Sequence, residues 1–168
     1  MNIIKAVIFQ ILTLSVLSCS NTSQEYVVEL NSNWEFKSEN DKDYLPATVP
    51  GTVHLDLLKN GKIDDPFFRL NEHKQQWIDK LDWDYRTSFD VNDFHFDYDA
   101  IELDFFGLDT YADVYLNDSL IYSSDNMFIG KTVNVKNNIQ KGENNLLIKF
   151  KSPIDIGIEM YDKLGYKL

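Results

Sequence analysis

The strongest constraint on the fold is an alternation of apolar and polar residues that recurs in several short segments of the chain. Successive side chains of a β-strand point to opposite faces of its sheet, so a period of two predicts strands with one buried face. Segment 85–91 has this pattern, and segments 101–105, 112–116 and 146–150 repeat it. The residues that share the predicted inner face of the first segment are Tyr85, Thr87, Phe89 and Val91.

The connections between these segments have the composition of tight turns. Asn117 and Asp118 separate two strand-like runs, and both residue types tolerate the positive φ angles of a two-residue hairpin. A second polar turn is predicted at residues 141–144. Short strands joined at regular spacing by polar turns predict an all-β fold, an antiparallel jelly-roll β-sandwich. Its facing sheets are expected to bury Leu103, Phe105, Val114, Leu116, Ile148 and Phe150.

One or two short helices are predicted to interrupt the sandwich. Segment 52–59 has apolar residues on one helical face, with Thr52 in place for an N-cap and Gly61 for a C-cap. Segment 71–80 is polar apart from two neighbouring apolar residues and predicts a turn or two of surface helix. The full prediction is therefore a jelly roll with one or two short helices and a single hydrophobic core.

The N-terminal segment has the features of an export signal. Lys5 precedes an apolar run of about 13 residues, which is too short to span a bilayer as a helix. The run ends in V-L-S-C, which resembles a bacterial lipoprotein box with Cys19 as the lipidated residue. We expect residues 1–18 to be a signal peptide of the lipoprotein type and residues 19–24 a polar tether. The alternative is an ordinary signal peptide that contains a cysteine.

These features predict an exported protein of the bacterial periplasm or outer membrane, which contacts the membrane only through a lipid anchor. Lys and Arg number 16 against 27 Asp and Glu, so the formal net charge is −11. Removing residues 1–18 deletes one lysine and no acid, which changes −11 to −12. A nucleic acid is not expected as a partner, because binding phosphates needs a concentrated basic surface. The histidines His54, His73 and His95 lack metal-site spacing, and neither a metal nor another cofactor is expected.

Five short motifs give the chain a specific resemblance. They read V-P-G-T-V-H at 49–54, D-P-F-F at 65–68, W-D-Y-R-T-S-F at 83–89, G-L-D-T-x-A at 107–112 and D-N-M-F at 125–128. In their order and spacing they resemble the N-terminal, galactose-binding-like sandwich domain of family-2 glycoside hydrolases, and within that family the β-mannosidases. The resemblance covers residues 25–168, which are expected to form this one domain.

The resemblance implies a parent enzyme that hydrolyses terminal β-D-mannose residues of oligosaccharides or glycoproteins with retention of configuration. Such an enzyme uses two carboxylates, one as acid and base and one as nucleophile. In the family both are glutamates of a (β/α)8 barrel that follows the sandwich domains, and the chain is expected to end before that barrel. No catalytic residue is assigned, and the chain alone is expected to be inactive. Its implied partners are further sandwich and barrel domains and, through the parent enzyme, a mannose-containing glycan.

The resemblance also implies one substrate contact. In the family, the turn that corresponds to residues 123–128 reaches toward the mouth of the active site, where a polar residue can bind a sugar hydroxyl. Asn126, with Asp125 beside it, fills this position. The alternative is an Asx turn, in which such side chains bond their own backbone.

The tryptophans and one arginine complete the set of candidate residues. Trp34 and Trp83 are predicted to pack in the core or against a neighbouring domain, whereas Trp77 is the best candidate for an exposed ring. Arg86 lies on the polar side of its strand and is expected to pair with an acid. Two rival functions are a stand-alone carbohydrate-binding module and a docking domain without a ligand. An exposed apolar patch would favour a domain of a larger enzyme over both.

Overall fold

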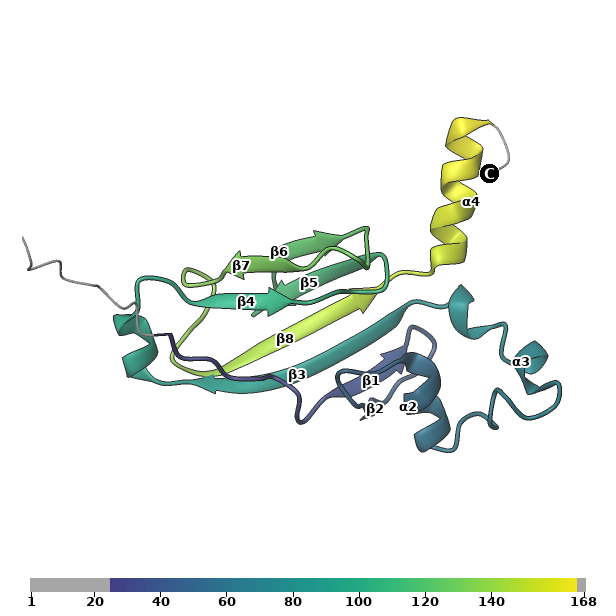
Figure 1. Ribbon diagram of the computed structural model, residues 1–168, viewed down its shortest axis with the longest axis horizontal. Helices are drawn as coiled ribbons and strands as arrows, with labels where there is room; N and C mark the ends of the chain where they lie inside the picture. Colours follow the sequence, from purple (N-terminus) through teal and green to yellow (C-terminus); the bar gives the residue numbers. More distant parts are fainter. Residues whose placement is uncertain (1–24, 166–168) are drawn as a thin grey trace, which may run out of the picture.

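A computed structural model describes residues 25–165 of the chain, where eight strands form two antiparallel sheets (Figure 1). The larger sheet has the order β2-β1-β3-β8-β5-β6. In that order its strands span Leu45–Pro46, Glu35–Ser38, Trp83–Val91, Gly142–Phe150, Ala112–Leu116 and Ser119–Ser124. The smaller sheet pairs β4 (Glu102–Phe105) with β7 (Lys131–Asn134). The predicted signal peptide, Cys19 and the tether lie outside the described residues.

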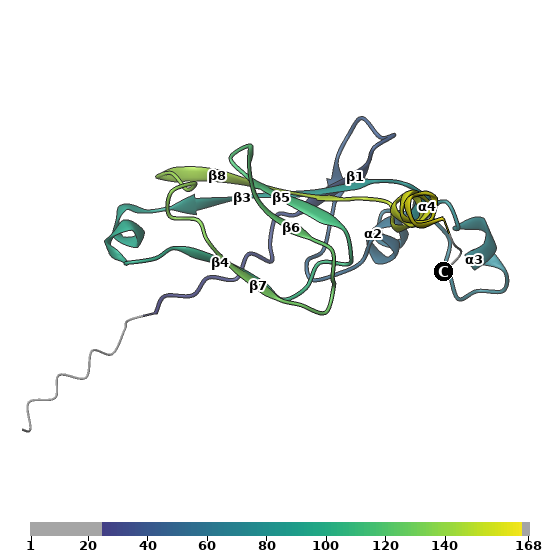
Figure 2. The same cartoon turned by 90° about the horizontal axis from the view of Figure 1, so that it is seen from above.

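The smaller sheet packs against the larger one, and the hydrophobic core lies between them (Figure 2). Val114, Leu116 and Ile148 are buried, as the alternation predicts. Leu103 and Phe105 of the smaller sheet are partly buried and pack against the same core, as does Phe150. The prediction of an all-β antiparallel sandwich is therefore confirmed.

The predicted hairpin joins β5 to β6. Asn117 and Asp118 have φ angles of 48° and 65°, which is the left-handed region that a two-residue hairpin requires at both positions. Leu116 and Ser119 face each other across the turn. The hairpin prediction is thus confirmed at the level of backbone conformation.

The first predicted helix is present as α2 (Val53–Lys59). The Thr52 hydroxyl accepts a hydrogen bond from the backbone nitrogen of Leu55 at 3.3 Å, which confirms the N-cap. The C-cap residue is Asn60, and Gly61 follows it with a φ of 66°. Gly61 therefore takes the left-handed position just after the helix, where the absence of a Cβ removes the steric cost.

The second predicted segment, which was expected to form a turn or two of surface helix, contains two short helical turns. Segment 71–80 divides into α3 (Asn71–Lys74) and the 3-10 helix η2 (Ile78–Lys80). The side-chain amide of Gln75, just after α3, donates to the Asp64 carbonyl oxygen at 2.7 Å. This side chain is held against the preceding loop, and the helix stops at this point.

Two further helical elements were not predicted from the sequence. One is the 3-10 helix η3 (Asp93–Asp97), and the other is α4 (Pro153–Leu164). The Ser152 hydroxyl accepts from the backbone nitrogen of Asp155 at 3.2 Å, and Gly165 ends α4 with a φ of 71°. These are ordinary start and stop signals. No helix within residues 25–165 is long and apolar enough to cross a membrane.

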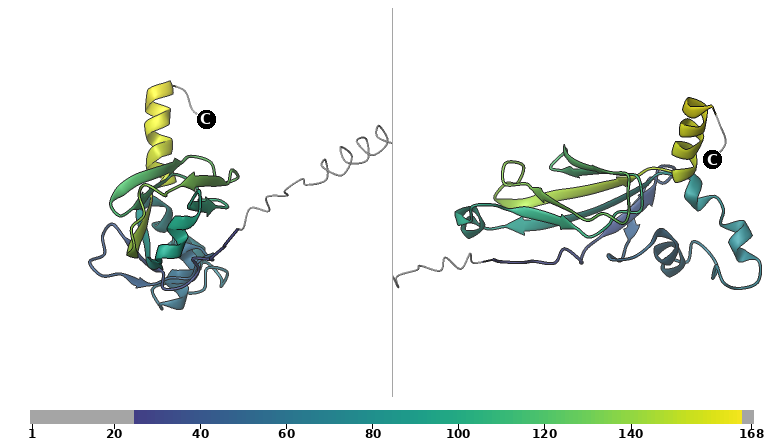
Figure 3. Two further views of the ribbon diagram at one scale, coloured as in Figure 1. Left: turned by 90° about the vertical axis from the view of Figure 1, so that its left-hand side faces the viewer. Right: turned by 45° about the horizontal axis from the view of Figure 1, so that its top comes forward.

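The strand register gathers several connections at one end of the sandwich. Trp83 and Ala112 both lie opposite Phe150, and Ala112 also lies opposite Ser124. The elements that meet at this end, called the loop end, are segment 60–82, loops 106–111 and 125–130, and helix α4 (Figures 1 and 3). The opposite end, called the turn end, carries the 117–118 hairpin, η3 and residues 136–142.

Candidate functional site

The predicted sugar-contacting residues lie on loop 125–130, which joins β6 to β7 at the loop end. Both Asp125 and Asn126 are exposed. The Asn126 side-chain oxygen accepts from the backbone nitrogen of Phe128 at 3.0 Å, so the Asx turn is present. This bond uses the oxygen of the amide and not its nitrogen. The Nδ2 group of Asn126 can still donate to a ligand while the turn holds the side chain in place.

Loop 106–111 packs directly against loop 125–130. A Cβ atom at Gly107 would lie 2.6 Å from the Met127 carbonyl oxygen, and one at Gly130 would lie 3.0 Å from the Phe105 carbonyl oxygen. Real Cβ atoms do not approach a backbone oxygen to 2.6 Å and rarely to 3.0 Å, so the two glycines permit the contact. The position of Asn126 therefore depends on a close backbone approach between the two loops.

Segment 60–82 forms the third side of the loop end and contains two adjoining hollows. The larger has a volume of about 520 Å³ and is lined by Asp64, Asp65, Phe68, Arg69, Asn71 and Lys74. The smaller, of about 240 Å³, has Trp77 in its wall.

Trp77 is 40% exposed, and its ring centroid lies 6.2 Å from that of Trp83. Trp77 is thus the partly exposed ring that the sequence predicted, and it also packs on a core residue. Trp34 and Trp83 are buried, which confirms their predicted packing role.

The buried carboxylate of Asp56 holds helix α2 in place. Asp56 is 1% exposed and accepts from the Tyr85 hydroxyl at 2.9 Å and from the backbone nitrogen of Thr48 at 2.9 Å. Burial, and then the neighbouring charge of Asp56, raises the pKa of Tyr85, so the phenol stays protonated and remains a donor. These bonds tie α2 to β3 and to the motif that precedes the helix. They have a structural role.

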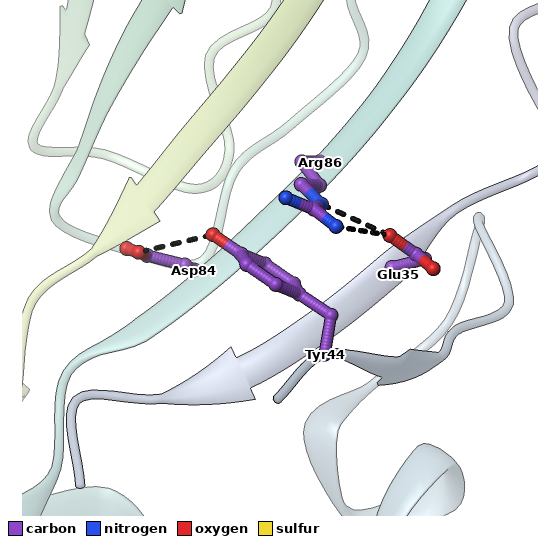
Figure 4. A network of polar contacts seen from close by, with 4 residues as sticks. All are labelled: Glu35, Tyr44, Asp84 and Arg86. Carbon is purple, nitrogen blue, oxygen red and sulfur yellow. Dashed lines mark hydrogen bonds and ion pairs between the residues drawn. The ribbon is translucent and has the colours of Figure 1, made fainter. Parts of the chain in front are cut away.

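The outer face of the large sheet carries a second polar network (Figure 4). Arg86 donates from two nitrogens to one carboxylate oxygen of Glu35, at 2.9 and 2.8 Å, and its guanidinium lies 3.6 Å from the ring centroid of Tyr44. The expected pairing of Arg86 with an acid is confirmed. The Tyr44 hydroxyl is 3.5 Å from Asp84, and burial, followed by the Asp84 charge, raises the pKa of Tyr44. Arg86 thus covers one face of the Tyr44 ring, and the Lys37 ammonium lies 4.9 Å from the ring centroid.

The base of helix α4 is joined to the sheet by a charged contact. Lys151 lies 2.6 Å from a carboxylate oxygen of Asp113, and Ser123 donates to the same carboxylate at 2.6 Å. The hydrogen bond from Lys151, and then that from Ser123, lowers the pKa of Asp113. The same pairing raises the pKa of Lys151. Both groups are charged near neutral pH and hold the strand that leads into α4.

The described residues contain no group of three histidine, cysteine or acidic side chains that could hold a metal ion. His54 lies in α2, His73 in α3 and His95 in η3, so the three histidines occupy separate elements. The chemistry available at the loop end is therefore that of hydrogen-bond donors, carboxylates and apolar rings.

The comparisons with known proteins agree with the fold. Residues 34–168 match the family described as glycosyl hydrolase 2 galactose-binding domain-like. The chain belongs to this family. The solved structure of a β-D-mannosidase from Dictyoglomus thermophilum superimposes with a TM-score of 0.83 and 43% identity, covering 86% of this chain and 18% of that one.

Curated relatives extend the similarity to eukaryotes. A β-mannosidase B of Emericella nidulans is 40% identical over 72% of this chain, and a mouse β-mannosidase is 35% identical over 74% of it. The chain spans only 15% and 14% of these two relatives. The resemblance deduced from the five motifs, to a family-2 sandwich domain of the β-mannosidase type, is therefore confirmed.

The motifs of this glycosyl hydrolase 2 domain converge in space. The first leads into α2, the second lies in segment 60–82, the third forms β3, and the last two supply loops 106–111 and 125–130. What the sequence did not reveal is that aromatic residues of three motif regions, Phe67, Phe106 and Phe128, lie at the same end and are almost fully exposed. The available signal at each position was an aromatic residue beside another large apolar residue, Phe68, Phe105 or Met127.

Proposed function

We propose that this chain is the N-terminal, non-catalytic sandwich domain of a retaining β-mannosidase. The observation that carries the proposal is the 43% identity and TM-score of 0.83 shared with a solved β-D-mannosidase over 86% of the chain. Retaining hydrolysis needs two carboxylates on opposite sides of the scissile bond. In this proposal both belong to another domain of the same enzyme, and the sandwich supports that domain.

The proposed enzyme acts on terminal β-D-mannose residues of a glycan, and loop 125–130 contributes one wall of its substrate site. Asn126 donates from Nδ2 to a sugar hydroxyl while its Oδ1 remains in the turn with the Phe128 nitrogen. Asp125, exposed beside it, can accept from a second hydroxyl. A neutral hydrogen bond of this kind contributes about 1 kcal/mol net, so the contact orients the sugar and does not by itself hold it.

Two substitutions separate the substrate contact from the turn. In the longest natural polypeptide that contains these residues, Asn126→Ala removes both functions, whereas Asn126→Asp keeps an acceptor for the Phe128 nitrogen and removes the donor. Both should lower kcat/KM for an aryl β-mannoside by about fivefold, which corresponds to about 1 kcal/mol. Wild-type kinetics in both variants would contradict the contact, and loss in Asn126→Ala alone would leave the residue with a structural role only.

A carbohydrate-binding module is the second candidate, and the observation that favours it is Trp77 beside a hollow of about 240 Å³. An aromatic face can stack on the apolar side of a pyranose, and the neighbouring polar groups could bind its hydroxyls. Titration of the chain with mannobiose tests this function by calorimetry. Millimolar or tighter binding that is lost in Trp77→Ala would favour the module, and absence of heat would favour the non-catalytic domain.

We further propose that the protein is exported to the bacterial periplasm or outer membrane and anchored through a lipid on Cys19. The support is the apolar run that ends in V-L-S-C and the polar residues that follow it. Wild-type cells should incorporate a fatty-acid analogue into the protein, and Cys19→Ala cells should not. Equal labelling of both would contradict the anchor, and an uncleaved cytoplasmic precursor would contradict export.

A further inference from the structure

Segment 25–30, the first part of the chain that the structure describes, packs on the 3-10 helix η3 at the turn end (Figures 1 and 2). The Tyr26 ring meets the Phe94 ring edge-on, with centroids 5.4 Å apart, and its centroid is also 5.4 Å from that of His95. The Phe94 and His95 centroids are 3.9 Å apart. Two segments that are far apart in the sequence therefore meet in a cluster of three rings.

Helix η3 is held on the hydrophobic core. The Asn92 backbone nitrogen donates to Nδ1 of His95 at 2.9 Å, which fixes the histidine ring at the start of the helix. Phe96 packs against buried core residues, and its carbonyl oxygen accepts from Nζ of Lys136 at 3.2 Å. Phe94, between these two contacts, remains 44% exposed. The ring cluster thus has a fixed base and an exposed outer part.

The exposed part of the cluster continues into apolar residues of the same segment. Tyr26, Val27 and Val28 are 54%, 73% and 58% exposed. Together with Phe94 they are called the turn-end patch. A tyrosine has an apolar ring and a polar hydroxyl, which suits the boundary between the headgroups and the acyl chains of a bilayer. The patch therefore has the chemistry of a shallow contact with a lipid surface.

The charged side chains around the turn-end patch favour one kind of lipid. Segments 25–30, 92–99 and 136–141 contain five acids and two bases, namely Glu25, Glu29, Asp93, Asp97 and Asp99 against Lys136 and Lys141. One of the bases is neutralised, since Lys141 lies 2.5 Å from a carboxylate oxygen of Asp93. The excess of negative charge repels anionic headgroups. A zwitterionic phospholipid surface is therefore the partner that fits the patch.

We propose that the turn-end patch rests on the membrane and that the loop end points away from it. This inference rests on the proposed lipid anchor at Cys19. Glu25 follows Cys19 by six residues, so the anchor lies at most about 22 Å from the start of the patch. The nine-residue strand β8, which connects the two ends of the sandwich, is about 30 Å long. The anchor therefore brings the turn end to the bilayer first, and the loop that carries Asn126 faces away from the lipid.

Hydroxyl-radical footprinting on vesicles tests this contact. The longest natural polypeptide with its lipid is reconstituted into vesicles of phosphatidylethanolamine and phosphatidylcholine, and a form that begins at Ser20 is kept in solution. We expect Tyr26 and Phe94 to be oxidised about fivefold more slowly on the vesicles. Tyr44, on the outer face of the large sheet, is the reference and should react equally in both samples.

Two results of this experiment would overturn the proposal. Equal oxidation of Tyr26 and Phe94 in the two samples would mean that the patch does not touch the lipid. Protection of Tyr44 to the same degree would mean that the protein lies flat on the vesicle and not on its turn end.

A change of lipid tests the charge argument. When phosphatidylglycerol replaces part of the zwitterionic lipid at low salt, the protection of Tyr26 should decrease, because the acids of the turn end then face anionic headgroups. Stronger protection with phosphatidylglycerol would overturn the assignment of a zwitterionic surface.

A pair of variants tests the patch itself. The double variant Val27→Ser/Phe94→Ser should lose most of the difference in Tyr26 oxidation between vesicles and solution. Leu55→Ser, which replaces an exposed apolar residue of α2, is the control and should keep that difference. Undiminished protection of Tyr26 in the double variant would contradict the contact.

Fatty-acid labelling of the same samples distinguishes this inference from the proposed anchor. A labelled Cys19 with unprotected rings would retain the anchor and reject the contact. If Cys19 carries no label, this single cysteine of the 168-residue chain is coupled to a maleimide phospholipid in the vesicles. Protection of Tyr26 and Phe94 in the coupled sample would support the contact and reject only the natural anchor, and its absence would reject both.

Discussion

The two ends of the sandwich differ in whether their side chains have contacts within the domain. At the turn end, Asn144 is fully buried and donates to the carbonyl oxygens of Gln140 and Gly142 at 2.7 and 2.9 Å. Its side-chain oxygen accepts from the Gln140 backbone nitrogen and from Asn117, both at 2.8 Å. At the loop end, by contrast, Phe106 and Phe128 remain 94% and 85% exposed.

This difference separates residues that fold the domain from residues that interact. Buried polar groups cost stability unless they are hydrogen-bonded, and Asn144 has four partners. Exposed phenyl rings do not add to the stability of the fold in this way. A substitution at the turn end should therefore change folding, whereas one at the loop end should leave folding nearly unchanged.

The largest expected effect is that of Asn144→Ala at the turn end. The substitution leaves two carbonyl oxygens and two donors without their partner, and we expect the free energy of unfolding to fall by about 3 kcal/mol. Urea denaturation measures the change. Asn145→Ala, an exposed neighbour on β8, is the control and should cost much less. Equal costs for the two variants would show that the buried hydrogen bonds of Asn144 do not stabilise the turn end.

The next largest effect is expected for the buried hydrogen bond between Tyr85 and Asp56. Tyr85→Phe removes the hydroxyl that donates to Asp56 and leaves a carboxylate oxygen unpaired in a site that is 1% exposed. We expect a loss of about 2 kcal/mol in the free energy of unfolding. Tyr115→Phe, on the outer face of β5, is the matched control and should be nearly neutral. A neutral Tyr85→Phe would show that α2 does not depend on this bond.

A smaller, pH-dependent effect is expected where α4 joins the sheet. The pKa of Asp113 is lowered, chiefly by the hydrogen bond from Lys151, so its ionised form stabilises the folded state above the pKa of the unfolded chain. Asp113→Asn should cost less than about 1 kcal/mol near neutral pH, because Lys151 is half-exposed. The difference between wild type and variant should vanish as pH falls through the folded pKa of Asp113. Urea titrations at several pH values check this, and a difference that grows in acid would contradict it.

The smallest effect on folding is expected at the exposed rings of Phe106 and Phe128. Phe106→Ser and Phe128→Ser should each change the free energy of unfolding of the 168-residue chain by less than about 0.5 kcal/mol, since neither ring is buried. The same denaturation experiment measures both variants. A loss comparable to that of Asn144→Ala would mean that the rings pack within the domain.

The sequence predicts the parts of the molecule that local physics decides. Alternation identifies β3, β5 and β8 because each strand has one face on the core, and Asn117–Asp118 identifies the hairpin because both residues tolerate positive φ. Helix α4 was missed although Ser152 and Gly165 cap it. Its apolar residues Ile154, Ile158 and Tyr161 are spaced by four and three, which is the period of a helix and not the period of two that identifies the strands. The loop end could not be predicted as one surface, because its segments meet only through strand register.

The most direct test of the proposed function is the hydrolysis of an aryl β-mannoside by the 168-residue chain and by the longest natural polypeptide that contains it. The longer polypeptide should turn over the substrate with retention of configuration, and the chain alone should show no turnover, because both carboxylates of the reaction are assigned to another domain. Turnover by the purified chain that disappears when one of its own acids is replaced would contradict the assignment.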